Sequence, residues 1–173
     1  KSGPPMNWLP RLKIFRNNLD SPLFDATSRG TFIHQCIQGL TLTGDARSDV
    51  KRAFWFGLKH TISPQSEALQ HESEILSALL WLAELPQAEN WLANGMMEQI
   101  ITNETGENLR CDLIVYGPDA ITVVEFKSGA PEVLPDPAHI RQVEKYIALL
   151  RRAQQLPVKG VLAYLDQRRI VEL

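Results

Sequence analysis

The chain has 173 residues, of which 44% are hydrophobic and 22% charged, and its formal net charge is −2 at pH 7. This length and composition predict one globular domain with enough apolar residues for a core. No apolar run approaches the ~20 residues that cross a bilayer, so we do not expect a membrane protein. The charge excludes a uniformly basic surface but not a local phosphate-binding face.

The first 27 residues predict an irregular start, because four prolines interrupt them and leave room for at most a short helix around Leu12–Leu19. The opening KSGPPMNWLPRL has no apolar core of the kind found in signal peptides, which predicts a cytoplasmic protein. The first methionine is Met6. We therefore expect the chain to be a fragment of a longer protein or to carry added residues at its start.

Three helical patterns follow. Residues 28–40 place apolar side chains on one stripe at helical spacing, and residues 44–60 predict a second helix with Asp45 near its start. Residues 63–85 predict a third, long helix that ends before Pro86. The tryptophans Trp55, Trp81 and Trp91 are expected to be core or rim residues rather than base-stacking platforms.

The apolar period then changes to that of strands. We expect strands at residues 96–102, 110–117 and 120–127, with a tight turn at Gly117–Asp119 that makes the second and third antiparallel neighbours. A helix is expected at residues 137–154, a strand at 158–165 and a short last strand at 170–173. The predicted fold class is α/β of the mixed α+β kind, with a mainly helical part at residues 1–93 and a sheet at residues 94–173.

Polar residues stand at the ends of these strands, where apolar ones are expected. Asp112 opens the second strand, and Glu125 and Lys127 share one face at the end of the third. The hairpin turn should bring Asp112 beside Glu125. Gln142 and Tyr146 lie one turn apart on the following helix. A structural ion pair would explain Glu125 and Lys127 alone, whereas two carboxylates beside a lysine suit Mg²⁺ or Mn²⁺.

The pattern Asp112-x12-Glu125-x-Lys127 resembles that of the PD-(D/E)XK nuclease superfamily. Two further motifs, Gln142-x-x-x-Tyr146 and the GTFIH of residues 30–34, are similar to those of its RecB-like branch. The resemblance implies a restriction-endonuclease-like core with a mixed sheet of three or four strands, flanked by helices and preceded by a helical extension. It also implies that residues 1–173 form a single nuclease domain, in which the helical part supplies His34.

The resemblance implies a role for each motif residue. His34, Asp112 and Glu125 would be the metal ligands, together with the backbone carbonyl of Phe126. Lys127 would contact the attacking water or the scissile phosphate. The residues that would orient the lysine and the DNA strand are Gln142 and Tyr146.

Other candidates come from position alone. Glu98 on the first strand is an additional acidic residue that points either toward the metal or to the surface. Arg141 and Lys145 lie beside Gln142, where a phosphate backbone would pass. Two departures from the family pattern stand out. Cys111 replaces the proline of the motif, and with two cysteines the chain lacks the four that hold an iron–sulfur cluster in some relatives.

The cluster-free pattern is similar to the nuclease domains at the C-terminal end of UvrD-like helicases, as in RecB and AddA. It implies a Mg²⁺- or Mn²⁺-dependent deoxyribonuclease, the exonuclease domain of a helicase-nuclease in DNA repair and recombination. The substrate would be a single DNA strand, delivered by a helicase domain of the same full-length chain or by a helicase subunit. Two alternatives stay open: a catalytically silent module that binds DNA or protein, and a stand-alone repair or restriction-type endonuclease.

Overall fold

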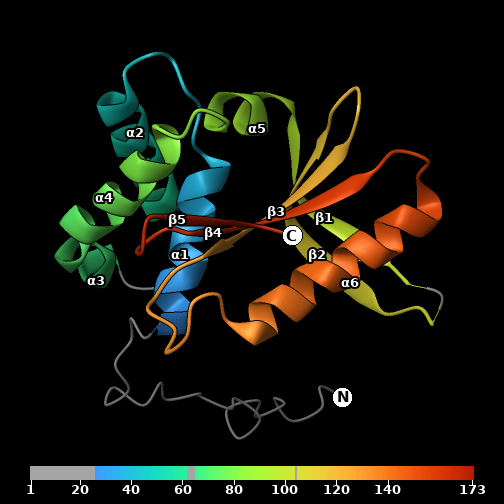
Figure 1. Ribbon diagram of the computed structural model, residues 1–173. Helices are drawn as coiled ribbons and strands as arrows, with labels where there is room; N and C mark the ends of the chain where they lie inside the picture. Colours follow the sequence, from blue (N-terminus) through green and yellow to red (C-terminus); the bar gives the residue numbers. More distant parts are fainter. Residues whose placement is uncertain (1–25, 62–64, 104) are drawn as a thin grey trace, which may run out of the picture.

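The computed structural model describes residues 26–61, 65–103 and 105–173, and in these the helices come first (Figure 1). The short helix expected around Leu12–Leu19 lies outside the described residues. Among the described residues, five helices precede the first strand: α1 (Ala26–Gln38), α2 (Ala46–His60), α3 (Gln65–Gln70), α4 (Glu72–Ala83) and α5 (Ala88–Asn94). Asp45 is the N-cap of α2, as expected, and its side chain accepts from the Ser48 amide at 3.2 Å.

One mixed sheet follows, with its five strands in chain order: β1 (Gly95–Thr102), β2 (Asn108–Tyr116), β3 (Ile121–Lys127), β4 (Val158–Tyr164) and β5 (Arg169–Glu172). All neighbouring pairs are antiparallel except β3 and β4, which are parallel and joined by α6 (Pro137–Ala153). The expectation of three or four strands was too low, because the short segment after the turn at residues 165–168 pairs with β4 as a fifth strand. The mixed α+β class itself is confirmed.

Helices cover both faces of this sheet (Figure 1). On one face α1, α2 and α4 form a core with residues such as Phe32, Phe54 and Phe126. On the other face α6 packs Val143 and Ile147 against the sheet. The strand alternation therefore places Phe126 in the first core and leaves its neighbours, Glu125 and Lys127, directed toward α6.

The third predicted helix breaks in two. The break is at His71, whose φ of −103° and ψ of 12° are not helical. Residues 70–74 are all polar and at best half-buried, so no apolar contact holds one straight helix across the junction. The sequence prediction also assigned no element to residues 88–94, which form α5, with Trp91 buried.

Trp55 is not a core residue. This side chain is 56% exposed on α2, whereas Trp91 is 5% exposed and belongs to the core. The buried stripe of α2 includes Phe54 and Leu58. Trp55 follows Phe54 by one residue and so lies about 100° round the helix from it, on the outward face.

Candidate metal centre

Asp112 and Glu125 meet where the pairing of β2 with β3 ends. The register ends at Leu113 with Val124, so the two acids are the next residues on the adjoining strands. The Phe126 amide donates to Asp112 Oδ2 at 2.8 Å, and the Asp112 amide donates to Glu125 Oε2 at 3.5 Å. Both carboxylates are buried, at 7% and 3% exposure. The hairpin thus holds two acids together in a setting where charge is costly.

His34 reaches this pair from α1. The buried stripe of α1 packs on the sheet and leaves His34 over its edge. His34 Nδ1 lies 3.2 Å from Asp112 Oδ1, and Nε2 lies 3.2 Å from the Phe126 carbonyl oxygen. Burial lowers the pKa of His34, but the hydrogen bond and charge of Asp112, with Glu125 and Glu98, outweigh it, so the pKa is raised above 6.5.

Lys127, Gln142 and Tyr146 form one hydrogen-bond chain with Glu125. Lys127 Nζ donates to Glu125 Oε1 and to Gln142 Oε1, both at 2.9 Å. Gln142 Nε2 donates to the same Glu125 oxygen at 2.8 Å and approaches the Tyr146 hydroxyl at 2.9 Å. That hydroxyl donates to the Arg110 carbonyl at 2.7 Å. Helix α6 therefore holds the ammonium group of Lys127 in position through Gln142.

The same surroundings set the protonation of this network. Burial, with the charge of Asp112, raises the pKa of Glu125, although Lys127 opposes the effect. Burial, with the charge of Glu125, raises the pKa of Tyr146 to about 12, so its hydroxyl keeps the proton that it donates. Burial also raises the pKa of Cys111 to about 12, which keeps this thiol neutral and disfavours it as a metal ligand.

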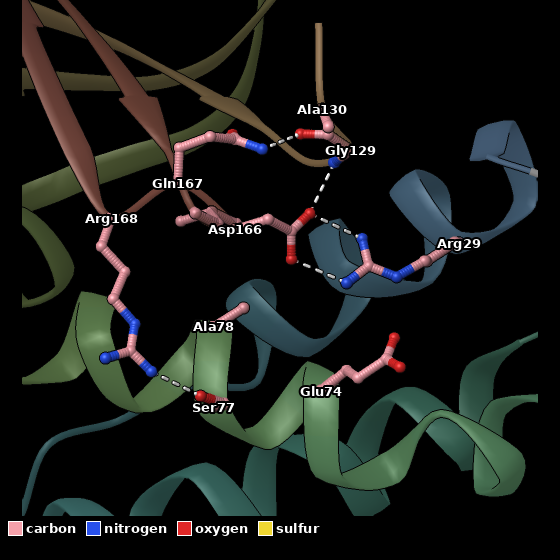
Figure 2. A pocket seen from close by; sticks show the side chains of 10 residues that line it. Arg29, Glu74, Ser77, Ala78, Gly129, Ala130, Asp166, Gln167 and Arg168 are labelled. Carbon is pink, nitrogen blue, oxygen red and sulfur yellow. Dashed lines mark hydrogen bonds and ion pairs between the residues drawn. The ribbon is translucent and has the colours of Figure 1, made fainter.

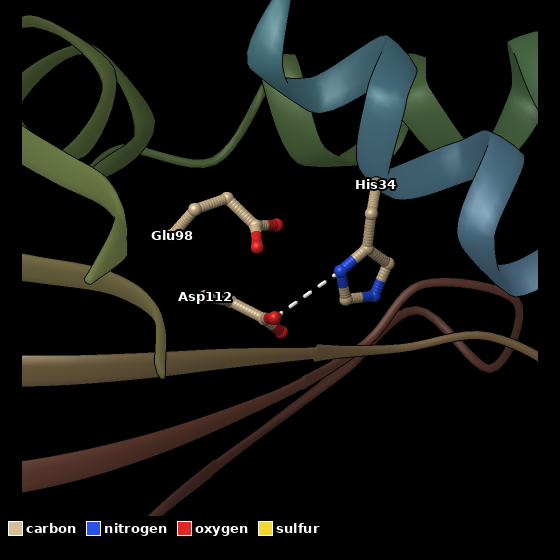
Figure 3. A group of neighbouring side chains, drawn as sticks. All are labelled: His34, Glu98 and Asp112. Carbon is tan, nitrogen blue, oxygen red and sulfur yellow. Dashed lines mark ion pairs between the residues drawn. The ribbon is translucent and has the colours of Figure 1, made fainter. Parts of the chain in front are cut away.

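Glu98 is directed into the site from β1. It lies between Met97 and Gln99, which pair with Leu113 and Cys111 on either side of Asp112. Its φ of 53° is in the left-handed region that non-glycine residues rarely adopt. Arg110 Nε pairs with Glu98 Oε2 at 2.9 Å, and Gln38 Nε2 donates to Glu98 Oε1 at 3.1 Å. One ligand atom each from His34, Glu98 and Asp112 lies within 4.8 Å of the others (Figure 3).

These donors suit a hard divalent cation. Two or three carboxylates, one imidazole and one carbonyl are the oxygen-rich set that Mg²⁺ and Mn²⁺ accept. The close triad contains Glu98 rather than Glu125. Glu125 Oε1 accepts from Lys127 and Gln142. Both nitrogens of His34 face acceptor oxygens, so a cation would compete with a proton there.

A cavity of about 370 Å³ opens over these groups and is lined by Gly30, Thr31, His34, Gln35, Gln38, Glu98, Arg110, Asp112, Glu125 and Gln142. Sequence reasoning missed Gln38 and Arg110, since nothing in their spacing ties them to the motifs. Arg141 and Lys145 are exposed on α6, but among the described residues they are not part of this cavity lining. Their role in DNA binding stays a prediction.

A neighbouring cavity of about 480 Å³ lies between α1, α4 and the loops that follow β3 and β4 (Figure 2). Arg29 and Asp166 form a two-point ion pair at its centre, with distances of 2.8 and 2.7 Å. Asp166 also accepts from the Gly129 amide, and Gln167 donates to the Gly129 carbonyl. This network ties the start of α1 to the loop beyond Lys127.

Within the described residues, no helix is both long and apolar enough to traverse a bilayer. No protein-family model matches the chain, and no curated protein matches it. Among solved structures, the chain is similar to one titled "Crystal structure of SSO0001", with 22% sequence identity and a TM-score of 0.34. The match covers 61% of this chain and 59% of that one, and so less than two thirds of its length.

Proposed function

We propose that this chain is a metal-dependent deoxyribonuclease with a restriction-endonuclease-like core of the PD-(D/E)XK type. The observation that carries the proposal is that several motif residues donate hydrogen bonds to the same carboxylate, that of Glu125. One oxygen of this acid accepts from Lys127 and Gln142, and its other oxygen accepts from the amide of Asp112. Motif residues from two strands and a helix thus meet at one carboxylate, next to His34 and Asp112.

Each residue has a chemical task that its contacts support. A bound Mg²⁺ or Mn²⁺ would neutralise phosphate charge and lower the pKa of a coordinated water. His34, Asp112, Glu125 and the Phe126 carbonyl would hold the cation. Lys127, kept in position by Glu125 and Gln142, would stabilise the negative charge that develops on the phosphate.

The substrate we propose is a DNA strand, and specifically a single strand supplied by a helicase domain or subunit. The support is the similarity of the motifs to those of RecB and AddA nuclease domains, which also favours a cytoplasmic role in repair and recombination. A silent binding module is the second candidate. It is disfavoured because Asp112, Glu125 and Lys127 are all present in hydrogen-bonded positions.

The test is digestion of end-labelled single- and double-stranded DNA with Mg²⁺, with Mn²⁺ or with EDTA. We expect cutting with either metal and none with EDTA. Asp112→Asn keeps the shape of the side chain and the acceptor for the Phe126 amide, so it should abolish cutting without unfolding the protein. Lys127→Ala should retain metal binding but lower kcat by roughly 100- to 1,000-fold.

Two results would reject the proposal. One is cutting by Asp112→Asn at the wild-type rate, which would move the active site elsewhere. The other is DNA binding without cutting under every metal condition, which would favour the silent module. Lys159→Gln is a matched control, because Lys159 is exposed on β4 and does not line the cavity of the candidate site.

A further inference from the structure

The exposed face of α2 is basic, although the chain as a whole has a net charge of −2. Four cationic side chains are exposed on this helix: Arg47, Lys51, Arg52 and Lys59. The acid within α2, Asp49, is 1% exposed and pairs with Arg52 at 2.5 Å. The positive charge of this face therefore has no exposed acid within the same helix to offset it.

Arg47, Lys51, Trp55 and Lys59 repeat every four residues, so they form one row along α2. The helical rise spaces successive members by about 6 Å. Three cations in line suit the repeated phosphates of a nucleic-acid strand, and the aromatic ring among them suits an unpaired base. We call these four residues the α2 row.

The aromatic side chains of this face are open to a ligand. Trp55 is 56% exposed and contacts Phe54 edge-on, with ring centroids 6.4 Å apart. Phe56 is 36% exposed and lies against His60, with centroids 4.1 Å apart and ring planes at 30°. Large exposed rings beside exposed cations are typical of surfaces that bind another molecule.

This face adjoins the candidate metal centre. A Cβ at Gly39 would lie 2.4 Å from Phe56 Cδ1, so the end of α1 and the ring of Phe56 are in direct contact. The preceding residue, Gln38, lines the cavity of the centre and donates to Glu98. The flank of α2 that carries Phe56 therefore lies near the cavity, and we expect a strand held by the α2 row to reach the cavity along this side.

We infer that the α2 row is a binding site for single-stranded nucleic acid, which holds the strand outside the metal centre. The inference rests on the proposed nuclease function, since it concerns how that substrate is held. A single strand fits better than a duplex, because only unpaired bases expose a face to Trp55. The lysines and arginine of the row contact phosphates, so binding tolerates many base sequences.

The test is fluorescence anisotropy with labelled oligothymidylate in EDTA, where no metal-dependent cutting occurs. Trp55→Ala should weaken binding at least ~5-fold, because it removes a stacked base. The double variant Lys51→Gln/Lys59→Gln should lower the slope of log Kd against log salt by about 1.4, the value for two lost phosphate contacts on a single strand. Lys159→Gln should bind like wild type.

Wild-type binding by both Trp55→Ala and the double lysine variant would overturn the inference, as would no measurable binding by the wild-type protein. Competition with polyglutamate distinguishes a site for nucleic acid from a site that binds any acidic polymer, such as an acidic protein. If it displaces the oligonucleotide as well as unlabelled oligothymidylate does, the surface is a general polyanion site and the inference fails. Thermal unfolding of each variant checks that the exposed substitutions leave the fold unchanged.

The two proposals fail in different ways. Binding that depends on the α2 row without any cutting would reject the nuclease function and leave the binding site in place. Metal-dependent cutting by variants that bind normally would reject the α2 row and leave the nuclease function. In active protein, row variants should raise KM for long single strands while kcat stays within about 2-fold of wild type.

Discussion

Lys127 and Gln142 are joined by a hydrogen bond of 2.9 Å from Nζ to Oε1, and both donate to the same oxygen of Glu125. The last residue of β3 is thus positioned by a side chain from α6, a helix that follows it along the chain. Because the lysine has two fixed acceptors, its ammonium group is aimed before any substrate arrives. This arrangement makes Gln142 a positioning residue rather than a metal ligand.

Gln142→Ala should therefore lower kcat by roughly 10- to 100-fold, the usual effect of losing a residue that orients an active-site group. Metal affinity should change little, because Asp112 and His34 keep their contacts. Tyr146→Phe is the matched comparison, since it removes the hydroxyl that bonds Gln142 and leaves the Lys127 contact intact. Steady-state kinetics beside metal titration calorimetry measures both effects. A larger loss in Tyr146→Phe than in Gln142→Ala would contradict this assignment.

His34→Ala should weaken Mn²⁺ binding more than Mg²⁺ binding, because imidazole suits the softer ion better than a hard oxygen site does. Calorimetric titration of both metals into both proteins gives the comparison. His60→Ala is the control, since it removes an exposed histidine of α2 that does not line the cavity of the metal centre. Unchanged Mn²⁺ affinity in His34→Ala would remove the histidine from the ligand set.

The sequence alone predicts those contacts that follow from strand alternation, tight turns and helix capping. Alternation places Glu125 and Lys127 on one face, and the tight turn at Gly117–Asp119 leaves Asp112 and Glu125 side by side. Asp45 is identifiable as an N-cap because a short acceptor stands before a helical pattern. In each case the partner is near in sequence or fixed by strand pairing.

The remaining contacts depend on tertiary packing. The turn of Glu98 into the site requires a φ of 53° that its residue type does not favour. Gln38 meets Glu98 because the tertiary fold brings the end of α1 within hydrogen-bond distance of a β1 side chain. The break at His71 and the exposure of Trp55 likewise depend on which stripe of each helix is buried. The apolar periodicity of a helix does not by itself decide which of two possible faces is buried.

Asp166→Asn should destabilise the protein at neutral pH and have little effect in acid. Burial raises the pKa of Asp166, but the hydrogen bonds from Arg29 and the Gly129 amide, with the charge of Arg29, outweigh it and hold the pKa below 3.8. A lowered pKa means that the ionised pair stabilises the fold above about pH 4 and that this stabilisation is lost as the pH falls further.

Urea unfolding at about pH 7 should show a loss of about 1 kcal/mol for Asp166→Asn, a value that allows for partial exposure of the pair. The difference from wild type should shrink below about pH 3.8, where the wild-type carboxyl takes up its proton. Asp119→Asn changes an exposed turn residue and should alter stability by less than about 0.5 kcal/mol. A pH-independent deficit would show that Asp166 acts through shape rather than charge.

Gly57→Ala tests the packing of α2 on α1, which carries His34. Helix propensity alone favours alanine by about 1 kcal/mol. However, a Cβ at position 57 would lie 2.5 Å from Cys36 Sγ and 3.2 Å from Phe32 Cε2. Overpacking of this kind typically costs about 1–3 kcal/mol, so the substitution should lower Tm by several degrees despite the better propensity.

Cys36→Ala supplies the decisive comparison, because it removes the sulfur that a new Cβ would strike. Gly57→Ala should cost at least about 1 kcal/mol less in the Cys36→Ala background than in wild type, since the two sites share one contact. Thermal and urea unfolding of the four proteins in this cycle measures the coupling. Additive losses would show that α1 and α2 move apart freely. If the losses are additive, Gly57→Ala should also leave metal affinity unchanged, because the position of His34 would not depend on the contact between Gly57 and Cys36.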